Sequence, residues 1–248
     1  MTRHSGTDMS RSLRRFAHNL RSTPLHPQWF AVRRQGRQLR EICSGVRGIV
    51  VDIGCAGGAI RERLDDGTRY YGLDYYDTAT QWYHTRPDVF GDAQSLPFRD
   101  SSVDHVFLME VMEHLPDPDS CMQEIFRILR NRGTLVLSTP FLYPIHDAPL
   151  DFRRWTAHGL EYLADRHGFR LESLTPRGRP IETAALLANI ALSRLAISLG
   201  RLFRPLAILW LPVAILVPTI NSLAWLLARA DRDDAFMAHG YQALLTKP

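Results

Sequence analysis

The 248-residue sequence predicts an α/β fold, in which a largely parallel sheet is covered by helices on both faces and an apolar helical insert precedes the last strand. Three observations support this prediction. Short apolar runs alternate with helical stretches from Gly48 onward, a strongly apolar stretch interrupts this alternation after residue 180, and the final residues resume a strand pattern. Because 45% of the residues are hydrophobic and 23% are charged, disordered and fibrous protein classes are excluded.

The predicted strands are short runs rich in valine, leucine or aromatic residues, as expected of strands buried on both faces. The first strand covers Ile49–Ile53. The others cover residues 69–73, 89–90, 103–109, 134–138 and 169–174, and residues 241–247 form the closing strand.

Two amphipathic helices are predicted between the later strands. Asp119 caps the start of the first, and Gly133 ends it. Thr156 caps the second, which runs to His167. Helices in these positions are crossover connections between parallel strands.

The apolar insert covers residues 181–235. Within it, Pro205–Ala228 contains 24 residues without a charge, which as a helix would be about 36 Å long, enough for a bilayer core of about 30 Å. If the closing strand pairs beside residues 169–174, both ends of the insert lie at one sheet edge, so a single membrane crossing is excluded. Three arrangements stay open: helices in the membrane interface, a re-entrant helical hairpin made costly by Glu182 and Arg194, or a buried helix pair or dimer interface.

The N-terminal arm, residues 1–47, is strongly basic. It holds ten arginines and two acidic residues, a net charge of +8, whereas the rest of the chain has a net charge of −4. An anionic membrane surface attracts such an arm, while a solvated leader and nucleic-acid contact stay open, the last being unlikely. With no secretory signal and no cysteine framework, we expect an intracellular protein at the cytoplasmic face of the inner membrane.

The ends of the first two predicted strands carry the residues of a nucleotide site. Asp52 and Gly54 lie in the run VDIGCAGGAI, where glycines allow a ligand to approach the backbone. Asp74 ends the second strand and is placed to accept hydrogen bonds from ribose hydroxyls. Because the spacing does not match the G-x-G-x-x-G of nicotinamide sites, the sequence predicts another adenosine-containing cofactor.

Four runs occur in the order and spacing of a known family: DIGCAGG, YGLD, GDAQSLPFRDSSVDHVFLMEVMEHLPDP and FRILRNRGTLVLSTP. Residues 48–174 thereby resemble the class I S-adenosylmethionine-dependent methyltransferases of the type 11 group, which act on small molecules and glycans. The resemblance implies a Rossmann-like, doubly wound sheet of seven strands, with the last strand antiparallel. It also implies S-adenosyl-L-methionine as the cofactor. Ala56 stands where the family usually has glycine, which bears on affinity.

The resemblance also implies individual roles in cofactor binding. Asp52 and Gly54 would border the methionine moiety, and Asp74 would hold the ribose. Asp92 would contact the adenine amino group with Ala93 beside the ring, and Glu110 would face the methionine end. The other members of the expected cofactor set are Cys55, Ala56, Gly58 and Tyr75.

Methyl transfer is an in-line displacement from a sulfonium, so the protein must align the acceptor and remove a proton if the acceptor is a hydroxyl. His146 beside Asp147 is the first choice for the general base, and His114 is a further catalytic candidate; a purely structural role for either histidine stays open. No metal-ligand cluster is evident, so no metal is expected. The substrate-binding candidates are Tyr143, Asp151, Arg153, Arg154 and Trp155.

These features predict a methyltransferase that modifies an oxygen of a lipid-linked saccharide, glycolipid or other amphiphile. Methylation of an isoprenoid quinone is the alternative, and Trp82 would then line an apolar pocket. A catalytically inactive, membrane-associated binding module is the alternative from another class. The expected partners are the acceptor and a membrane surface touching residues 181–229, and a homodimer stays open. The expected domains are the arm (1–47), the cofactor-binding core (48–180), the insert (181–235) and the closing strand (236–248).

Overall fold

The computed structural model describes residues 20–202, 208, 210–230 and 235–248. The chain divides into two compact units. The helical unit combines residues 20–36 with Gly178–Met237, and the sheet unit combines Arg37–Arg177 with Ala238–Pro248. Residues 1–19 of the basic arm expected over 1–47 lie outside the described residues. Of its remainder, residues 20–36 group with the insert and residues 37–47 group with the sheet.

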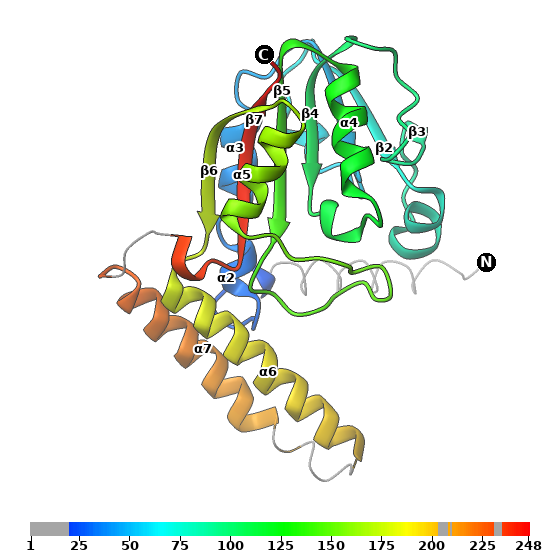
Figure 1. Ribbon diagram of the computed structural model, residues 1–248. Helices are drawn as coiled ribbons and strands as arrows, with labels where there is room; N and C mark the ends of the chain where they lie inside the picture. Colours follow the sequence, from blue (N-terminus) through cyan, green and yellow to red (C-terminus); the bar gives the residue numbers. More distant parts are fainter. Residues whose placement is uncertain (1–19, 203–207, 209, 231–234) are drawn as a thin grey trace, which may run out of the picture. The chain divides into compact units, whose positions relative to one another are not determined.

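The sheet unit is built on a seven-stranded sheet of order β3-β2-β1-β4-β5-β7-β6 (Figure 1). Strands β1 to β5 pair in parallel, whereas β7 is antiparallel to both β5 and β6. This confirms the predicted Rossmann-like α/β fold with its antiparallel last strand. The strands are β1 (Ile49–Ile53), β2 (Arg69–Asp74), β3 (Val89–Phe90), β4 (Val103–Met109), β5 (Leu129–Pro140), β6 (Arg170–Arg177) and β7 (Gly240–Thr246).

Helices and short turns connect these strands. Thr156 caps α5 as predicted, since its side chain accepts a 3.0 Å hydrogen bond from the Gly159 amide. The helices and helical turns around the sheet are α3 (Gln35–Cys43), η1 (Arg61–Arg63), η2 (Thr78–Tyr83), η3 (Met112–His114), α4 (Pro118–Ile128) and α5 (Ala157–Arg166).

The expected bounds of the α4 helix are wrong at both ends. Asp117, not Asp119, caps the helix, because the Asp117 carboxylate accepts from the Ser120 amide. The helix ends at Ile128, not at Gly133, since the chain enters β5 at Leu129. Gly133 falls inside β5, where the pairing with β4 shifts register. A Cβ at position 133 would lie 2.8 Å from the Arg130 carbonyl oxygen, so only glycine fits there.

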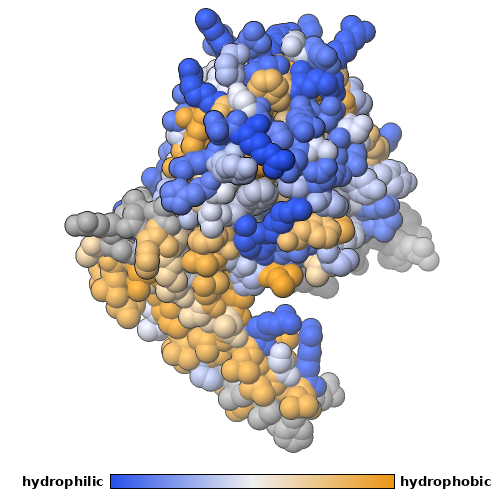
Figure 2. All heavy atoms as spheres, viewed as in Figure 1, coloured by the Kyte–Doolittle hydropathy of each residue, from blue (hydrophilic) through white to orange (hydrophobic). Residues whose placement is uncertain are grey.

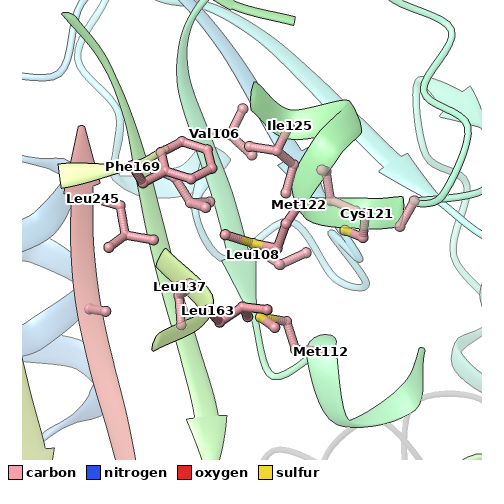
Figure 3. Packing of buried hydrophobic residues seen from close by; sticks show 14 of the residues in the cluster. Val106, Leu108, Met112, Cys121, Met122, Ile125, Leu137, Leu163, Phe169 and Leu245 are labelled. Atoms are coloured by element: carbon pink, nitrogen blue, oxygen red, sulfur yellow. The ribbon is translucent and has the colours of Figure 1, made fainter. Parts of the chain in front are cut away.

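Successive strand side chains enter different hydrophobic clusters on the two sheet faces. Val106 and Leu108 on β4 belong to the cluster that packs under α4 and α5 (Figure 3). Phe107 lies between them in sequence and packs with Leu39 and Cys43 of α3. Since all five side chains are buried, the carboxyl ends of the central strands rest on a fixed core.

The helical unit contains a hairpin of two long helices, α6 (Pro180–Leu202) and α7 (Trp210–Leu227), which pack side by side in opposite directions (Figure 1). It also contains α2 (Trp29–Val32) and the turn η5 (Ala235–Met237). The insert joins the end of β6 to the start of β7, and Arg177 pairs with Gly240 across these strands. Both ends of the insert therefore lie at one place in the sheet, as expected.

Buried polar groups join the hairpin helices to each other and to the segment before them. Asn189 donates a 2.8 Å hydrogen bond to Asn221, and Asn221 donates to the carbonyls of Pro24 and His26. The buried Glu182 carboxylate forms an ion pair with the Arg33 guanidinium. The charge of Glu182, which makes deep insertion costly on its own, is therefore paired inside the unit.

The outer surfaces of α6 and α7 remain strongly apolar (Figure 2). Ile215, Leu223 and Leu226 are 69%, 55% and 53% exposed. Only 28% of the most hydrophobic stretch of α6 and 22% of that of α7 is buried, and both helices are long and apolar enough to cross a membrane. Burial within the described residues therefore does not account for the hydrophobicity of the hairpin.

Candidate active site

A cavity of about 480 Å³ lies at the carboxyl ends of the central strands. Gly54 and Asp74 line it from the ends of β1 and β2, Asp92 from beyond β3, and Glu110 from the end of β4. The sheet order reverses at β1, from which β2 and β4 lie on opposite sides. Open α/β sheets bind ligands at such a switch point, so this cavity is the candidate cofactor site.

The loop after β1 takes an unusual backbone path along the cavity. Gly54 has φ +72°, and a Cβ there would come within 2.4 Å of Val111. Ala56 adopts φ 40° although it carries a side chain. The Ala56 amide donates a 3.0 Å hydrogen bond to the Asp74 carboxylate. This bond stabilises the left-handed turn although alanine stands where the family usually has glycine. Gly58 also has a positive φ but does not line the cavity.

Asp74 is the best-connected acidic side chain of the cavity. Its carboxylate accepts hydrogen bonds from the amides of Ala56 and Tyr75 and from the Thr78 hydroxyl, at 3.0, 2.8 and 3.2 Å. Asp92 accepts from the Gln94 amide at 2.8 Å, and Ala93 beside it is buried. All of these residues line the cavity, so the structure brings together the residues expected at the ribose and the adenine.

Besides Gly58, two expected cofactor residues lie outside the cavity lining. Asp52 is buried, where it accepts a 2.6 Å hydrogen bond from the Tyr70 hydroxyl. Burial raises the pKa of Asp52 to about 7. Cys55 is also buried, and burial raises its thiol pKa to about 12. These two residues support the loop from within the core.

Glu110 connects the cavity to the far strands of the sheet. The Glu110 backbone has φ 55°. The Glu110 carboxylate accepts a 2.6 Å hydrogen bond from the Ser138 hydroxyl on β5 and forms an ion pair with Arg177 on β6. Arg177 is a residue that the sequence analysis missed. Its role depends on the pairing of β6 beside β7, which no local motif marks.

Three ionisable side chains from two loops meet next to the cavity. Glu113 is fully buried, and its Oε1 lies 3.7 Å from His114 Nε2 and 3.8 Å from His146 Nε2. Burial raises the pKa of Glu113, and the facing Glu113 carboxylate raises the pKa of His146. His114 lines the cavity, whereas His146 is not among the residues that line the cavity. The two catalytic candidates therefore lie together, with ring centroids 5.0 Å apart.

The expected pairing of His146 with Asp147 does not form. Asp147 has φ 49°, lines the cavity and accepts from the Tyr83 hydroxyl at 3.3 Å. The carboxylates near the His146 ring are Glu113 and Asp151 instead. Adjacent residues diverge here because the left-handed backbone at Asp147 turns its side chain away from its neighbour.

The expected substrate-binding residues build the loop after β5. Arg154 binds the Asp151 carboxylate through two nitrogens and donates to the Tyr143 carbonyl, and the Arg154 pair lowers the pKa of Asp151 to about 2. Arg153 donates to the Leu115 carbonyl, and Trp155 packs against the core. None of these five residues lines the cavity, whereas Trp82 and Tyr83, from the turn η2, do.

Comparisons with known proteins agree with this geometry. Residues 51–137 match a family model described as a methyltransferase domain. Over 135 residues the chain is 36% identical to a probable S-adenosylmethionine-dependent methyltransferase of Mycolicibacterium smegmatis, covering 50% of this chain and 52% of the relative. Over 174 residues it is 29% identical to a ubiquinone biosynthesis O-methyltransferase of Xanthomonas oryzae, covering 63% and 66%.

Solved structures share the fold. A S-adenosylmethionine-dependent methyltransferase from Archaeoglobus fulgidus aligns with a TM-score of 0.54 at 18% identity, over 86% of this chain and 93% of that one. The chain spans about half the length of its first curated relative. Residues 51–137 of the sheet unit thus match the methyltransferase family, and the fold and the order of the motifs are those of class I S-adenosylmethionine-dependent methyltransferases, whose cofactor is S-adenosyl-L-methionine.

Proposed function

We propose that this protein transfers a methyl group from S-adenosylmethionine to an oxygen of an amphiphilic acceptor at a membrane surface. Lipid-linked saccharides and glycolipids are the acceptor classes that we favour. The observation that carries the transferase proposal is the cavity at the sheet switch point, where Asp74, Asp92 and Glu110 line one continuous space.

The cavity residues suit the parts of the cofactor. In the proposed assignment, the Asp74 carboxylate holds the ribose hydroxyls, Asp92 the adenine amino group, and Gly54 with Glu110 the methionine end. The bound cofactor supplies an electrophilic methyl group on a positively charged sulfur. Acidic residues around this space favour a cation electrostatically, and the aromatic rings of Trp82 and Tyr83 border it.

The acceptor oxygen must approach from the side of the loops that follow β4 and β5. As it bonds to the methyl carbon, the carbon–sulfur bond breaks and the hydroxyl proton passes to a base. His114 is the candidate whose ring lines the cavity, and Glu113 behind it stabilises the imidazolium that forms. His146, next to the same carboxylate, is a second acceptor for the proton.

The hairpin supports an amphiphilic acceptor. Its exposed isoleucine, leucine and tryptophan side chains are the composition of a surface that binds lipid. The chain reaches this hairpin directly from Arg177, the residue that pairs with Glu110 in the cavity. An enzyme that concentrates at a membrane meets lipid-linked acceptors at high local concentration.

An isoprenoid quinone is the alternative acceptor. The ubiquinone O-methyltransferase relative and the aromatic lining of the cavity by Trp82 and Tyr83 favour this class. A catalytically inactive module remains the competing class, in which the cavity serves binding alone. Labelled methyl transfer to a lipid-linked saccharide and to a demethylated quinone separates the two acceptors, and transfer to neither supports the inactive module.

Cofactor binding is tested first by calorimetric titration with S-adenosylhomocysteine. The substitution Asp74→Asn removes a charge that we assign to two ribose hydrogen bonds, so the affinity should fall about 100-fold, or about 3 kcal/mol. Asp77→Asn is the matched control, because Asp77 is exposed and accepts from Gln81 outside the cavity. Equal affinities of the Asp74→Asn variant and the wild type would remove the site assignment.

A further inference from the structure

The cluster of Glu113, His114 and His146 has features that proton transfer alone does not require. The ligand atoms of the three side chains all lie within 4.8 Å of one another. Glu113 is fully buried, and neither of its carboxylate oxygens has a hydrogen-bond partner among the described residues. A buried carboxylate without partners is costly, so a compensating group is expected at this position.

Both histidines present the same ring nitrogen to Glu113. His114 Nδ1 lies 2.6 Å from the Leu150 carbonyl oxygen, which only accepts hydrogen bonds. Nδ1 therefore carries the proton, and the lone pair of the neutral ring is on Nε2, the atom 3.7 Å from Glu113. In His146, Nδ1 faces the Pro144 carbonyl at 3.3 Å and the Asp151 carboxylate at 3.4 Å, which leaves Nε2 toward Glu113.

The groups behind the histidines are those that orient metal ligands. A histidine bound to a metal through one nitrogen commonly donates its other N–H to a carboxylate or a backbone carbonyl, which fixes the ring. Asp151 provides this partner for His146, and Leu150 provides it for His114. Arg154 holds Asp151 in turn through two hydrogen bonds. The arrangement thus has an inner set of three donors and an outer set that fixes two of them.

We propose that Glu113, His114 and His146 bind a divalent transition-metal ion of the zinc type. Two imidazoles and one carboxylate are a donor set found in zinc sites with an open fourth position. Magnesium and calcium prefer all-oxygen ligands and fit this set poorly. Tetrahedral ligands about 2.0–2.1 Å from zinc lie about 3.3 Å apart, so binding would shorten the two distances of 3.7 and 3.8 Å from Glu113 to the histidines by about 0.4–0.5 Å.

The sequence analysis expected no metal because His146 lies on a different loop from Glu113 and His114. The fold supplies the third ligand. Since His114 also lines the cavity, the ion would lie beside the space where an acceptor would bind. A metal-bound hydroxyl loses its proton to water more readily, so the ion would activate the acceptor oxygen in place of the His114 base, whose Nε2 lone pair would then be bound to the metal. This role rests on the proposed function, whereas metal binding itself does not.

Zinc binding is tested on the full-length protein, freed of any affinity tag and treated with a chelator. We expect calorimetric titration with zinc to show one site of micromolar or tighter affinity. Cobalt, used as a spectroscopic substitute, should give the visible absorption of a tetrahedral centre. His146→Ala should weaken zinc binding at least 10-fold, and Glu113→Gln should do the same. His158→Ala is the matched control, because that side chain is 93% exposed and outside the cluster.

Loss of zinc binding in His146→Ala can be told apart from misfolding. The His146 side chain is 27% exposed and does not line the cavity, so its removal should leave the fold and the cofactor site intact. This variant should bind S-adenosylhomocysteine as the wild type does. Absence of zinc binding in the wild type, or equal zinc affinity in wild type and both cluster variants, overturns the metal site. If S-adenosylhomocysteine binds while zinc does not, the metal proposal fails and the cofactor assignment stands; the reverse result supports the metal site and removes the cofactor assignment.

Discussion

Three buried carboxylates of the sheet unit differ in the hydrogen bonds that they receive. Asp74 accepts from three donors, Asp52 accepts from the Tyr70 hydroxyl, and Glu113 has no hydrogen-bond partner among the described residues. Burial disfavours the charged form, and hydrogen bonds to the carboxylate oppose this effect. The pKa is accordingly raised for both Asp52 and Glu113.

The raised pKa of Asp52 predicts how stability changes with pH. In the unfolded chain the group ionises near pH 4, whereas in the folded protein it keeps its proton up to about pH 7. Stability from this residue is therefore complete below pH 4 and is lost between about pH 4 and pH 7, at most about 1.4 kcal/mol per pH unit. Urea unfolding of Asp52→Asn across this window should show a gain over the wild type that grows with pH. A stability difference between Asp52→Asn and the wild type that does not change with pH would contradict this account.

The sequence predicted the residues of the cavity better than the cluster of Glu113, His114 and His146. Asp74 ends β2, Asp92 lies two residues after β3 and Glu110 follows β4 directly, so strand pairing alone brings them to one edge. Glu113 and His146 meet only because the loop after β5 folds around the Arg154–Asp151 pair. Contacts of that kind depend on long-range geometry that local patterns do not encode.

Elements with a strong apolar pattern matched their predicted bounds most closely. Strands β1, β3 and β4 begin and end where their apolar runs do. The junction of α4 and β5 was missed, because residues 129–133 have helical periodicity but pair with β4 and β7 or turn between them. Tertiary pairing outweighs local propensity at such a junction.

The α6–α7 hairpin depends on a small polar centre in an apolar interface. Asn221→Ala removes the acceptor of Asn189 and the donor to the carbonyls of Pro24 and His26, leaving buried groups unpaired. We expect a local destabilisation of about 2 kcal/mol, which increases amide hydrogen exchange in both helices about 30-fold. Unchanged exchange rates would contradict this prediction. Asn131→Ala is the control, since Asn131 is exposed in the sheet unit.

The chain combines a sheet unit with a largely polar surface and a helical unit with a largely apolar surface. If the helical unit binds lipid, replacing Ile215, Leu223 and Leu226 together by serine removes three exposed apolar side chains. Vesicle partitioning, measured by flotation with anionic liposomes, should then fall at least about 10-fold, because each side chain contributes on the order of 1 kcal/mol when partly inserted.

The control for partitioning is Tyr162→Ser, which removes a side chain that is 68% exposed on the sheet unit. This variant should float with vesicles as the wild type does. Cofactor affinity should be the same in both variants, because neither changes the cavity lining. A wild-type protein that does not float would remove the lipid-surface part of the proposed function and leave the methyltransferase part intact.

The pairing of Arg177 with Gly240 means that a hairpin turn of a few residues is all that β6 and β7 require. The sheet therefore imposes no length on the segment between them, and sixty or so residues were accommodated without a change in strand order. The junction between β6 and β7 is therefore a position where the strand pairing tolerates a segment of any length and composition.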